Sequence, residues 1–239
     1  MNRLRYTSAL CVLVLASCHT GDTFRLLADP DPRVLYSVDT DEPLVALTID
    51  DGPDSESTQR ILDVLEAHGA TATFFLISDR TPGREAIVQA IVDAQHEIAN
   101  HLTRNEPAIE LAPAQFEDEL VRAHRALSRF GKSSWFRPGS GWYDDWMFPI
   151  LERHDYRLAL GTVYGLDAEI DSVWFTSRVI LWRARRGDII ILHDGGRRGQ
   201  RTVEILEKVL PELRRRGLRA VSLSELVEIA GANDESRAN

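Results

Sequence analysis

Two adjacent carboxylates, Asp50 and Asp51, stand between the apolar run LVALTI (44–49) and the pair Gly52-Pro53. Like charges at this spacing repel, and each raises the pKa of the other unless a cation or a hydrogen-bond donor lies nearby. The pair therefore indicates one of two things, a solvated turn or a site that receives positive charge.

Other residues able to do acid–base or metal chemistry occupy matching places along the chain. His101, Arg137 and His193 each end or directly follow a short apolar run. In folds with a parallel sheet, the carboxyl ends of the strands meet at one edge, and functional side chains collect there. We expect Asp50, Asp51 and these three residues to meet at that edge.

The elements that must position these residues alternate along the chain. Strand-like runs occur at 44–49, 72–77, 96–100, 134–137, 157–162, 188–193 and 219–223. Helical spacing of apolar residues falls between them, at 57–68, 82–95, 113–129 and 202–216. This alternation predicts an α/β fold with a parallel sheet, and a chain of 239 residues favours one barrel over two small domains.

Four motifs lie in order at the ends of predicted strands: TIDDGP (48–53), HEIANH (96–101), FRPGSG (136–141) and ILHDG (191–195). Together they resemble the polysaccharide deacetylase family of carbohydrate esterases, which includes chitin and peptidoglycan deacetylases. The resemblance covers about residues 43–227. It implies a distorted (β/α) barrel of the polysaccharide deacetylase type, with about seven parallel strands and a divalent metal, most often zinc, at their carboxyl ends.

The resemblance assigns Asp50 as the general base and Asp51 as a metal ligand, and a cation beside one carboxylate would offset the repulsion. His101 matches the first imidazole of the family's His-x-x-x-His motif, but Asn105 stands where the second belongs. An amide oxygen binds zinc more weakly than imidazole, so cobalt, nickel and manganese become alternatives. Asn105 is expected as a weak third ligand, with Glu106 or a water molecule as substitutes.

The third motif implies roles for residues around Arg137. By resemblance, Arg137 orients the Asp50 carboxylate, and the backbone N–H of Ser140 donates to the oxyanion. Ser140 replaces an aromatic residue of the family pattern, but a backbone donor does not depend on the side chain. Trp142 and Tyr143 follow closely and are expected either to stack on a sugar ring or to pack in the core.

The last motif makes His193 the general acid for the departing amine, a task that suits an imidazole near neutral pH. A carboxylate that tunes this histidine is expected in the segment YGLDAEIDSVWF. Both Asp167 and Asp171 fit, and Asp167 is favoured because it follows the run at 157–162 sooner. Trp174 is expected to wall the substrate groove or to pack in the core.

The N-terminus has the layout of a secretory signal, with Arg3 and Arg5 before a short apolar stretch. It ends in LASC (15–18), which resembles a bacterial lipobox, so residues 1–17 are expected to be removed and Cys18 to carry a lipid anchor. An ordinary signal peptide is the alternative. The protein is thus expected outside the cytoplasm, on the periplasmic or cell-surface side of a membrane.

The sequence also predicts the domain boundaries, and its net charge limits the class of partner. A tether is expected at 18–42, the catalytic domain at 43–229 and a polar tail at 230–239. The net charge of −9, which becomes more negative once residues 1–17 are lost, argues against nucleic acid as the main partner.

The expected function is metal-dependent hydrolysis of N-acetyl groups on amino-sugar polymers such as peptidoglycan, chitin-like glycans or exopolysaccharide. Two alternatives remain open at this point. One is a carbohydrate-binding protein with an impaired metal site, and the other is a metal-dependent amidase or esterase acting on a different substrate.

Overall fold

The computed structural model describes residues 31–238, and the predicted signal segment and lipidation site Cys18 lie outside this range. Within it, one nine-stranded parallel sheet has the order β1-β6-β5-β4-β3-β2-β8-β7, with β9 beside β2. The strands are β1 (Val34–Leu35), β2 (Leu44–Asp50), β3 (Thr73–Leu76), β4 (Glu97–Asn100), β5 (Trp135–Phe136), β6 (Arg157–Ala159), β7 (Val163–Tyr164), β8 (Ile189–His193) and β9 (Arg219–Val221).

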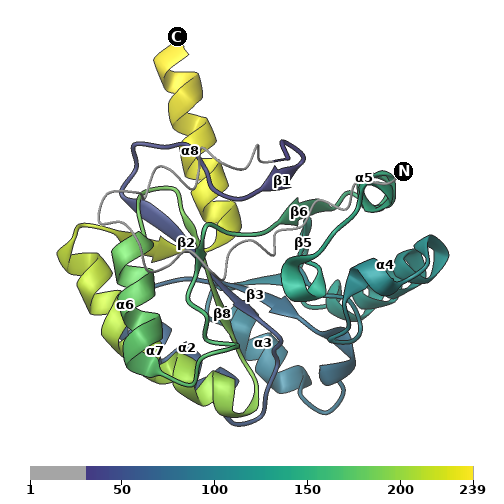
Figure 1. Ribbon diagram of the computed structural model, residues 1–239, viewed down its shortest axis with the longest axis horizontal. Helices are drawn as coiled ribbons and strands as arrows, with labels where there is room; N and C mark the ends of the chain where they lie inside the picture. The colour runs from purple at the N-terminus through teal and green to yellow at the C-terminus, as the bar shows by residue number, and fades with distance from the viewer. Residues whose placement is uncertain (1–30, 239) are drawn as a thin grey trace.

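The predicted barrel is confirmed. All seven predicted strands are present, and the sheet curls with helices packed against it (Figure 1). Two additional strands, β1 and β7, were not predicted, and each is two residues long.

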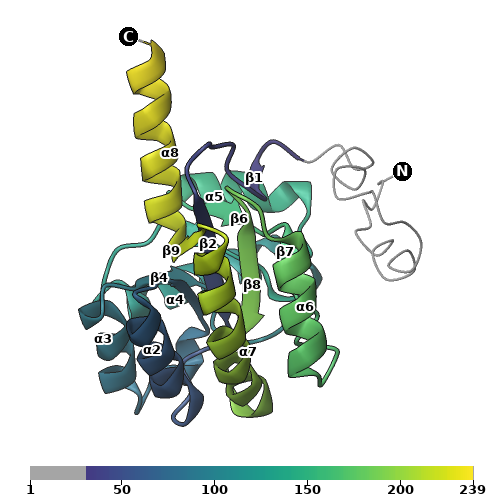
Figure 2. The same cartoon turned by 90° about the vertical axis from the view of Figure 1, so that its left-hand side faces the viewer.

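Helices α2, α3, α6 and α7 lie side by side over the outer face of the curled sheet (Figure 2). The α-helices are α2 (Ser57–His68), α3 (Glu85–Asp93), α4 (Pro113–Leu127), α5 (Phe148–Arg153), α6 (Val173–Arg183), α7 (Gly196–Arg215) and α8 (Leu223–Ala238). The four predicted helices correspond to α2, α3, α4 and α7, whereas α5, α6 and α8 were not predicted. None of the helices in the described residues is both long and apolar enough to cross a membrane.

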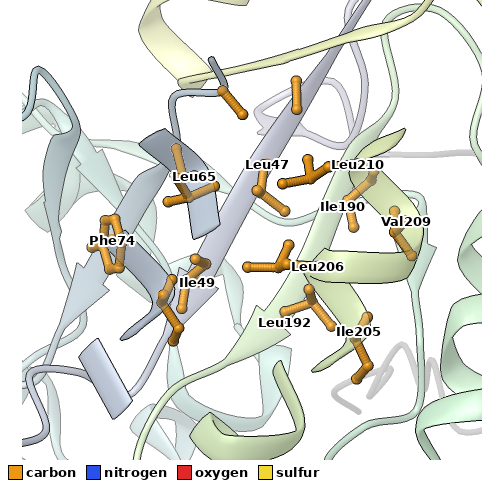
Figure 3. Close-up of a cluster of buried hydrophobic side chains, with 14 of the residues drawn as sticks. Leu47, Ile49, Leu65, Phe74, Ile190, Leu192, Ile205, Leu206, Val209 and Leu210 are labelled. Carbon is orange, nitrogen blue, oxygen red and sulfur yellow. The ribbon is translucent and has the colours of Figure 1, made fainter. Parts of the chain in front are cut away.

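Strand β2 is the centre of the fold, and all seven of its residues are buried. On the outer side, Leu47 and Ile49 pack with Leu206 and Leu210 of α7 in the main apolar cluster (Figure 3). The alternate residues, including Ala46, face a second cluster with residues of the neighbouring strands. Because both faces are covered, the strand reads as a continuous apolar run and not as an alternating one.

Both ends of the folded domain extend beyond the predicted boundaries. β1 lies inside the segment expected to be a tether, yet it pairs in parallel with β6, and Val34 is buried. The tether prediction is therefore wrong for residues 34–42, which belong to the sheet and its first connection. At the other end, the residues expected to form a polar tail continue α8 as far as Ala238.

Candidate active site

The carboxyl ends of four strands at one edge of the sheet, β5, β4, β2 and β8, bring the predicted residues together. Asp50 is the last residue of β2 and His193 the last residue of β8, and the two are direct partners in the parallel register. His101 directly follows β4, and Arg137 directly follows β5. Adjacent strands lie about 4.8 Å apart, so the predicted base and the predicted acid lie on neighbouring strands.

A buried ion pair joins Asp50 to Arg137. Nη1 of Arg137 donates to Oδ1 of Asp50 at 2.7 Å and to the Thr48 hydroxyl at 2.8 Å. Its other nitrogens donate to the carbonyl oxygens of Ala159 and Leu160, each at 3.0 Å. The guanidinium is thereby held in one orientation, and no hydrogen bond from the described residues reaches Oδ2 of Asp50.

Arg137 is only 2% exposed, so its charge depends on these partners. Burial lowers the pKa of Arg137, and the Asp50 carboxylate opposes that shift. The guanidinium also lies 4.1 Å from the ring centroid of Phe75, a cation–π contact on its apolar side. Since an arginine remains charged under such conditions, the pair places a fixed positive charge against Oδ1 of Asp50.

Asp51 and His101 form a second buried pair directly beside the first. Oδ1 of Asp51 lies 3.7 Å from Nε2 of His101. Nδ1 of His101 lies 2.7 Å from the carbonyl oxygen of Arg137, which can only accept, so Nδ1 carries the proton. The lone pair of Nε2 is consequently available on the side of Asp51. This arrangement, in which one ring nitrogen is fixed by a carbonyl and the other is free, is the usual preparation of a metal-ligating histidine.

These donors fit a divalent cation. An imidazole nitrogen and a carboxylate are a zinc-type pair, and Asn105 lines the same pocket as Asp51. No third His, Cys, Asp or Glu completes a metal cluster among the described residues. Moreover, Oδ2 of Asp51 already receives Nη1 of Arg198 at 3.3 Å, so only the other oxygen faces His101. The donor set therefore suits a weakly held divalent cation, which Asp51 and His101 would hold.

His193 is held by Asp167, as the favoured alternative predicted. Asp167 accepts the backbone N–H of His193 at 2.9 Å and lies 3.0 Å from Nδ1 of the ring. Burial lowers the pKa of His193, but the contact and charge of Asp167 outweigh this effect and raise the pKa to about 9. Asp171, the other alternative, is instead paired with Arg201 at 2.8 Å in an exposed position.

The residues expected around the substrate occupy different environments. Ser140 is exposed and has a φ of 61°, a left-handed conformation that orients its backbone N–H. Trp142 and Trp174 are 48% and 70% exposed, so both rings are available for stacking. Tyr143 instead contacts the hydroxyl of Tyr36 at 2.8 Å and packs against the apolar core.

A buried carboxylate that was not predicted lies beside the site and contacts the backbone of Asp50. Asp194 is 1% exposed and accepts hydrogen bonds from the hydroxyls of Ser57, at 2.5 Å, and Thr58 at the start of α2. Its backbone N–H donates to the carbonyl of Asp50 at 2.7 Å. Burial raises the pKa of Asp194, and the hydroxyl donors oppose that shift. The hydroxyls at the start of α2 were the one available signal, since buried carboxylates need such donors.

Comparisons with known proteins agree with this geometry. A family model described as polysaccharide deacetylase matches residues 37–159. A peptidoglycan-N-acetylglucosamine deacetylase from Bacillus cereus is 32% identical over 202 residues, covering 83% of this chain and 95% of the relative. A chitooligosaccharide deacetylase from Bradyrhizobium sp. is 29% identical, covering 76% and 90%.

Solved structures show the same fold. A crystal structure of a peptidoglycan N-acetylglucosamine deacetylase superposes with a TM-score of 0.77 at 27% identity, covering 81% of this chain and 92% of that one. A CE4 family pseudoenzyme from Bacillus anthracis superposes with a TM-score of 0.75 at 25% identity, covering 83% and 70%. With these matches and the strand-end residues described above, the chain belongs to the polysaccharide deacetylase family.

Proposed function

We propose that this protein hydrolyses N-acetyl groups on the amino sugars of a polymer outside the cytoplasm. The observation that carries the proposal is the register pairing of Asp50 with His193 at the ends of β2 and β8. It sets a carboxylate paired with Arg137 beside an imidazole that Asp167 keeps protonated. Amide hydrolysis needs both, a base that activates water and an acid that protonates the leaving amine.

The chain's own residues would perform the proton transfers. Oδ2 of Asp50, free of hydrogen bonds from the described residues, takes a proton from the attacking water as the water oxygen bonds to the acetyl carbon. The N–H of Ser140 donates to the oxygen that gains negative charge. His193 gives its proton to the sugar nitrogen as the C–N bond breaks, releasing acetate and a free amine.

A divalent cation held by Asp51 and His101, with Asn105 as a weak third ligand, would supply an acidified water and a positive charge near the acetyl oxygen. We infer that Asp51 and not Asp50 binds it, because Asp50 is committed to Arg137 whereas one oxygen of Asp51 faces Nε2 of His101. Zinc is proposed as the natural ion, and cobalt, nickel or manganese as substitutes.

The test of the proposed function is acetate release from N-acetylglucosamine oligomers by the wild-type chain and by Asp50→Asn. The substitution removes the base but keeps a side chain of the same shape, so kcat should fall at least 1000-fold while the protein remains folded. Binding of zinc, measured by calorimetry, should change by less than about threefold, since Asp50 is not a ligand here. Wild-type turnover by Asp50→Asn would show that the base is misassigned.

A second candidate function is sugar binding without catalysis. Two observations favour it: Asn105 in place of a second imidazole, and Arg198 on the carboxylate of Asp51. Similarity to a CE4 family pseudoenzyme points the same way. The variant Asn105→His separates the two functions. If the wild-type chain releases no acetate and Asn105→His releases it, the protein is a binder whose metal site has been weakened.

We also propose that the protein is exported and anchored through a lipid on Cys18. The proposal rests on the sequence at 1–18, outside the described residues. The chain should label with palmitate in a bacterial host and sediment with membranes. Cys18→Ala should abolish the label and release the protein, and a labelled Cys18→Ala chain would contradict the proposal.

A further inference from the structure

A second pocket lies on the other side of the segment that follows β3. Its lining comes from the turn after β3, from the loop after β4 and from one face of α4. The residues are Ser78, Asp79, Thr81, Pro82, Thr103, Arg122, Arg125, Ala126 and Arg129. None of them has a part in the chemistry assigned to the strand ends.

The rim of this pocket is basic, although the chain as a whole is acidic. Arg122, Arg125 and Arg129 contribute three positive charges against the single carboxylate of Asp79, in a chain with a net charge of −9. Arg122 lies 3.4 Å from the mostly buried Glu119 and 3.8 Å from Asp118. Arg129 lies 3.6 Å from Glu85. At these distances the pairs of the exposed arginines contribute little energy. Arg125 forms no ion pair or hydrogen bond within the described residues. The guanidinium of Arg125 is thus available to an anion, and those of Arg122 and Arg129 can bind one by leaving long ion pairs.

The floor of the pocket contains polar groups that have no partner. Thr81 and Thr103 are each 1% exposed, and neither hydroxyl forms a hydrogen bond within the described residues. A buried hydroxyl without a partner costs about 1–3 kcal/mol, so such groups mark places where a ligand supplies the missing acceptor. Two such hydroxyls in the lining of the pocket that the three arginines share favour a site for an anion over a chance surface patch.

The floor is also rigid and adjoins the catalytic pocket. The backbone N–H groups of Ser78 and Asp79 donate to the carbonyls of Leu102 and Thr103, at 3.0 and 3.2 Å. Between Asp79 and Thr81, the side chain of Arg80 points the other way and donates to the carbonyl of Asp51. The residues 78–82 therefore lie between the two pockets, with Arg80 lining one and its neighbours lining the other.

We propose that this pocket is a subsite for an anionic group, a carboxylate or a phosphate, on a unit of the polymer that neighbours the acetylated sugar. The proposal rests on the deacetylase function proposed above and adds a substrate class to it, an acidic glycan. Arginine forks recognise both anions through paired hydrogen bonds, and the threonine hydroxyls donate to the same oxygens.

The test compares three oligosaccharides of equal length. One is built of N-acetylglucosamine alone, one alternates it with N-acetylmuramic acid and so carries carboxylates, and one carries 6-phosphates. For the double variant Arg122→Gln/Arg125→Gln, kcat/KM on an acidic oligosaccharide should fall at least tenfold, mainly through KM. On the neutral oligosaccharide it should stay within twofold. Arg214→Gln, an exposed arginine in the last turn of α7, is the matched control and should change neither.

The two acidic oligosaccharides distinguish a carboxylate from a phosphate. The double variant should lose more kcat/KM on the oligosaccharide that carries the group the pocket prefers. Equal losses on neutral and acidic oligosaccharides, or no loss on either acidic one, would overturn the subsite while leaving the deacetylase function intact. If no oligosaccharide is deacetylated, the proposed function fails, and calorimetric titration decides the subsite alone. In that case the acidic oligosaccharides should bind the wild-type chain at least tenfold more tightly than the double variant, and equal binding would reject the subsite.

Discussion

The contact between His193 and Asp167 determines whether this site can act as an acid at neutral pH. The raised pKa, about 9, keeps the imidazole protonated throughout the range in which an unperturbed histidine, with a pKa near 6.5, loses its charge. Protonated His193 is the reactive form, so activity should hold through neutral pH and fall as the pH rises through about 9. Asp167 supplies the main attraction for the proton and should set this upper limit.

Asp167→Asn should therefore move the alkaline limb of the pH profile of kcat/KM downward by at least one pH unit. The change removes the negative charge beside Nδ1 but keeps the size of a side chain that is fully buried. The measurement is acetate release between pH 5 and pH 10. Asp171→Asn is the matched control, since that carboxylate is exposed and paired with Arg201. An alkaline limb unchanged in Asp167→Asn would mean that another group titrates there.

At this scale, sequence reasoning located the residues that end strands but not those that support them. Asp50, His101 and His193 were predictable because each carries its chemistry at the end of an apolar run. Asp194 could not be assigned its supporting role, because its partner Ser57 lies 137 positions away in the sequence. Arg198 lies 147 positions from Asp51 and gave no local signal. Contacts of this kind become visible only when the barrel brings distant loops together.

The loops after the strands share an unusual backbone conformation at the edge that holds the site. Asp51, Leu102, Ser140 and Leu166 all have positive φ values without being glycine, and each lies within three residues of a strand end or a site residue. Such residues are held in a less favourable conformation by the surrounding structure, typically where side chains must be aimed for function. The orientation of the site residues thus depends on the strand ends and also on the backbone conformation of the first turn of each following loop.

Ser140→Gly tests whether this loop acts through its backbone. Glycine keeps the N–H and adopts a φ near 61° without strain. The variant should keep kcat within about twofold of wild type, and the free energy of unfolding should rise by about 1 kcal/mol. Chemical denaturation and acetate release measure the two quantities. A loss of kcat beyond tenfold at unchanged stability would assign the role to the hydroxyl and not to the backbone.

The boundaries of helices were predicted well where hydrophobic periodicity was strong. They were predicted poorly where contacts with other elements determine where a helix begins. Helix α7 begins at Gly196, six residues before its apolar spacing starts at 202. Its first turns contain Gly199, where an added Cβ would lie 2.2 Å from the Ser57 hydroxyl. Close packing of α7 on α2 therefore requires a glycine that the sequence pattern reads as a helix breaker. Helix α6 was missed because Trp174 and Trp182 face solvent, which obscures an apolar stripe.

At the scale of the whole molecule, the segment before β2 packs on the sheet, although its composition predicts a tether outside the domain. Residues 29–42 are mostly polar and begin with DPDP (29–32), so they resemble a linker. Nevertheless Val34 is buried against the cluster around Phe136 and Leu158, and Tyr36 contacts Tyr143. The backbone N–H of Val38 also donates to Gly187, before β8, at 2.8 Å. This segment therefore links the β6 edge of the sheet to the strand that carries His193.

A chain beginning at Pro43 should consequently be less stable than one beginning at Asp31. The shorter chain exposes the apolar surface that Val34 and its neighbours cover, which is worth about 3 kcal/mol or more, and its melting temperature should fall by about 5–10 °C. Differential scanning calorimetry measures the difference. Deletion of residues 233–239 is the matched control, because the end of α8 projects away from the barrel in Figure 2. If the two N-terminal boundaries melted together, residues 31–42 would be a tether after all, and β1 would contribute nothing to the cooperative fold.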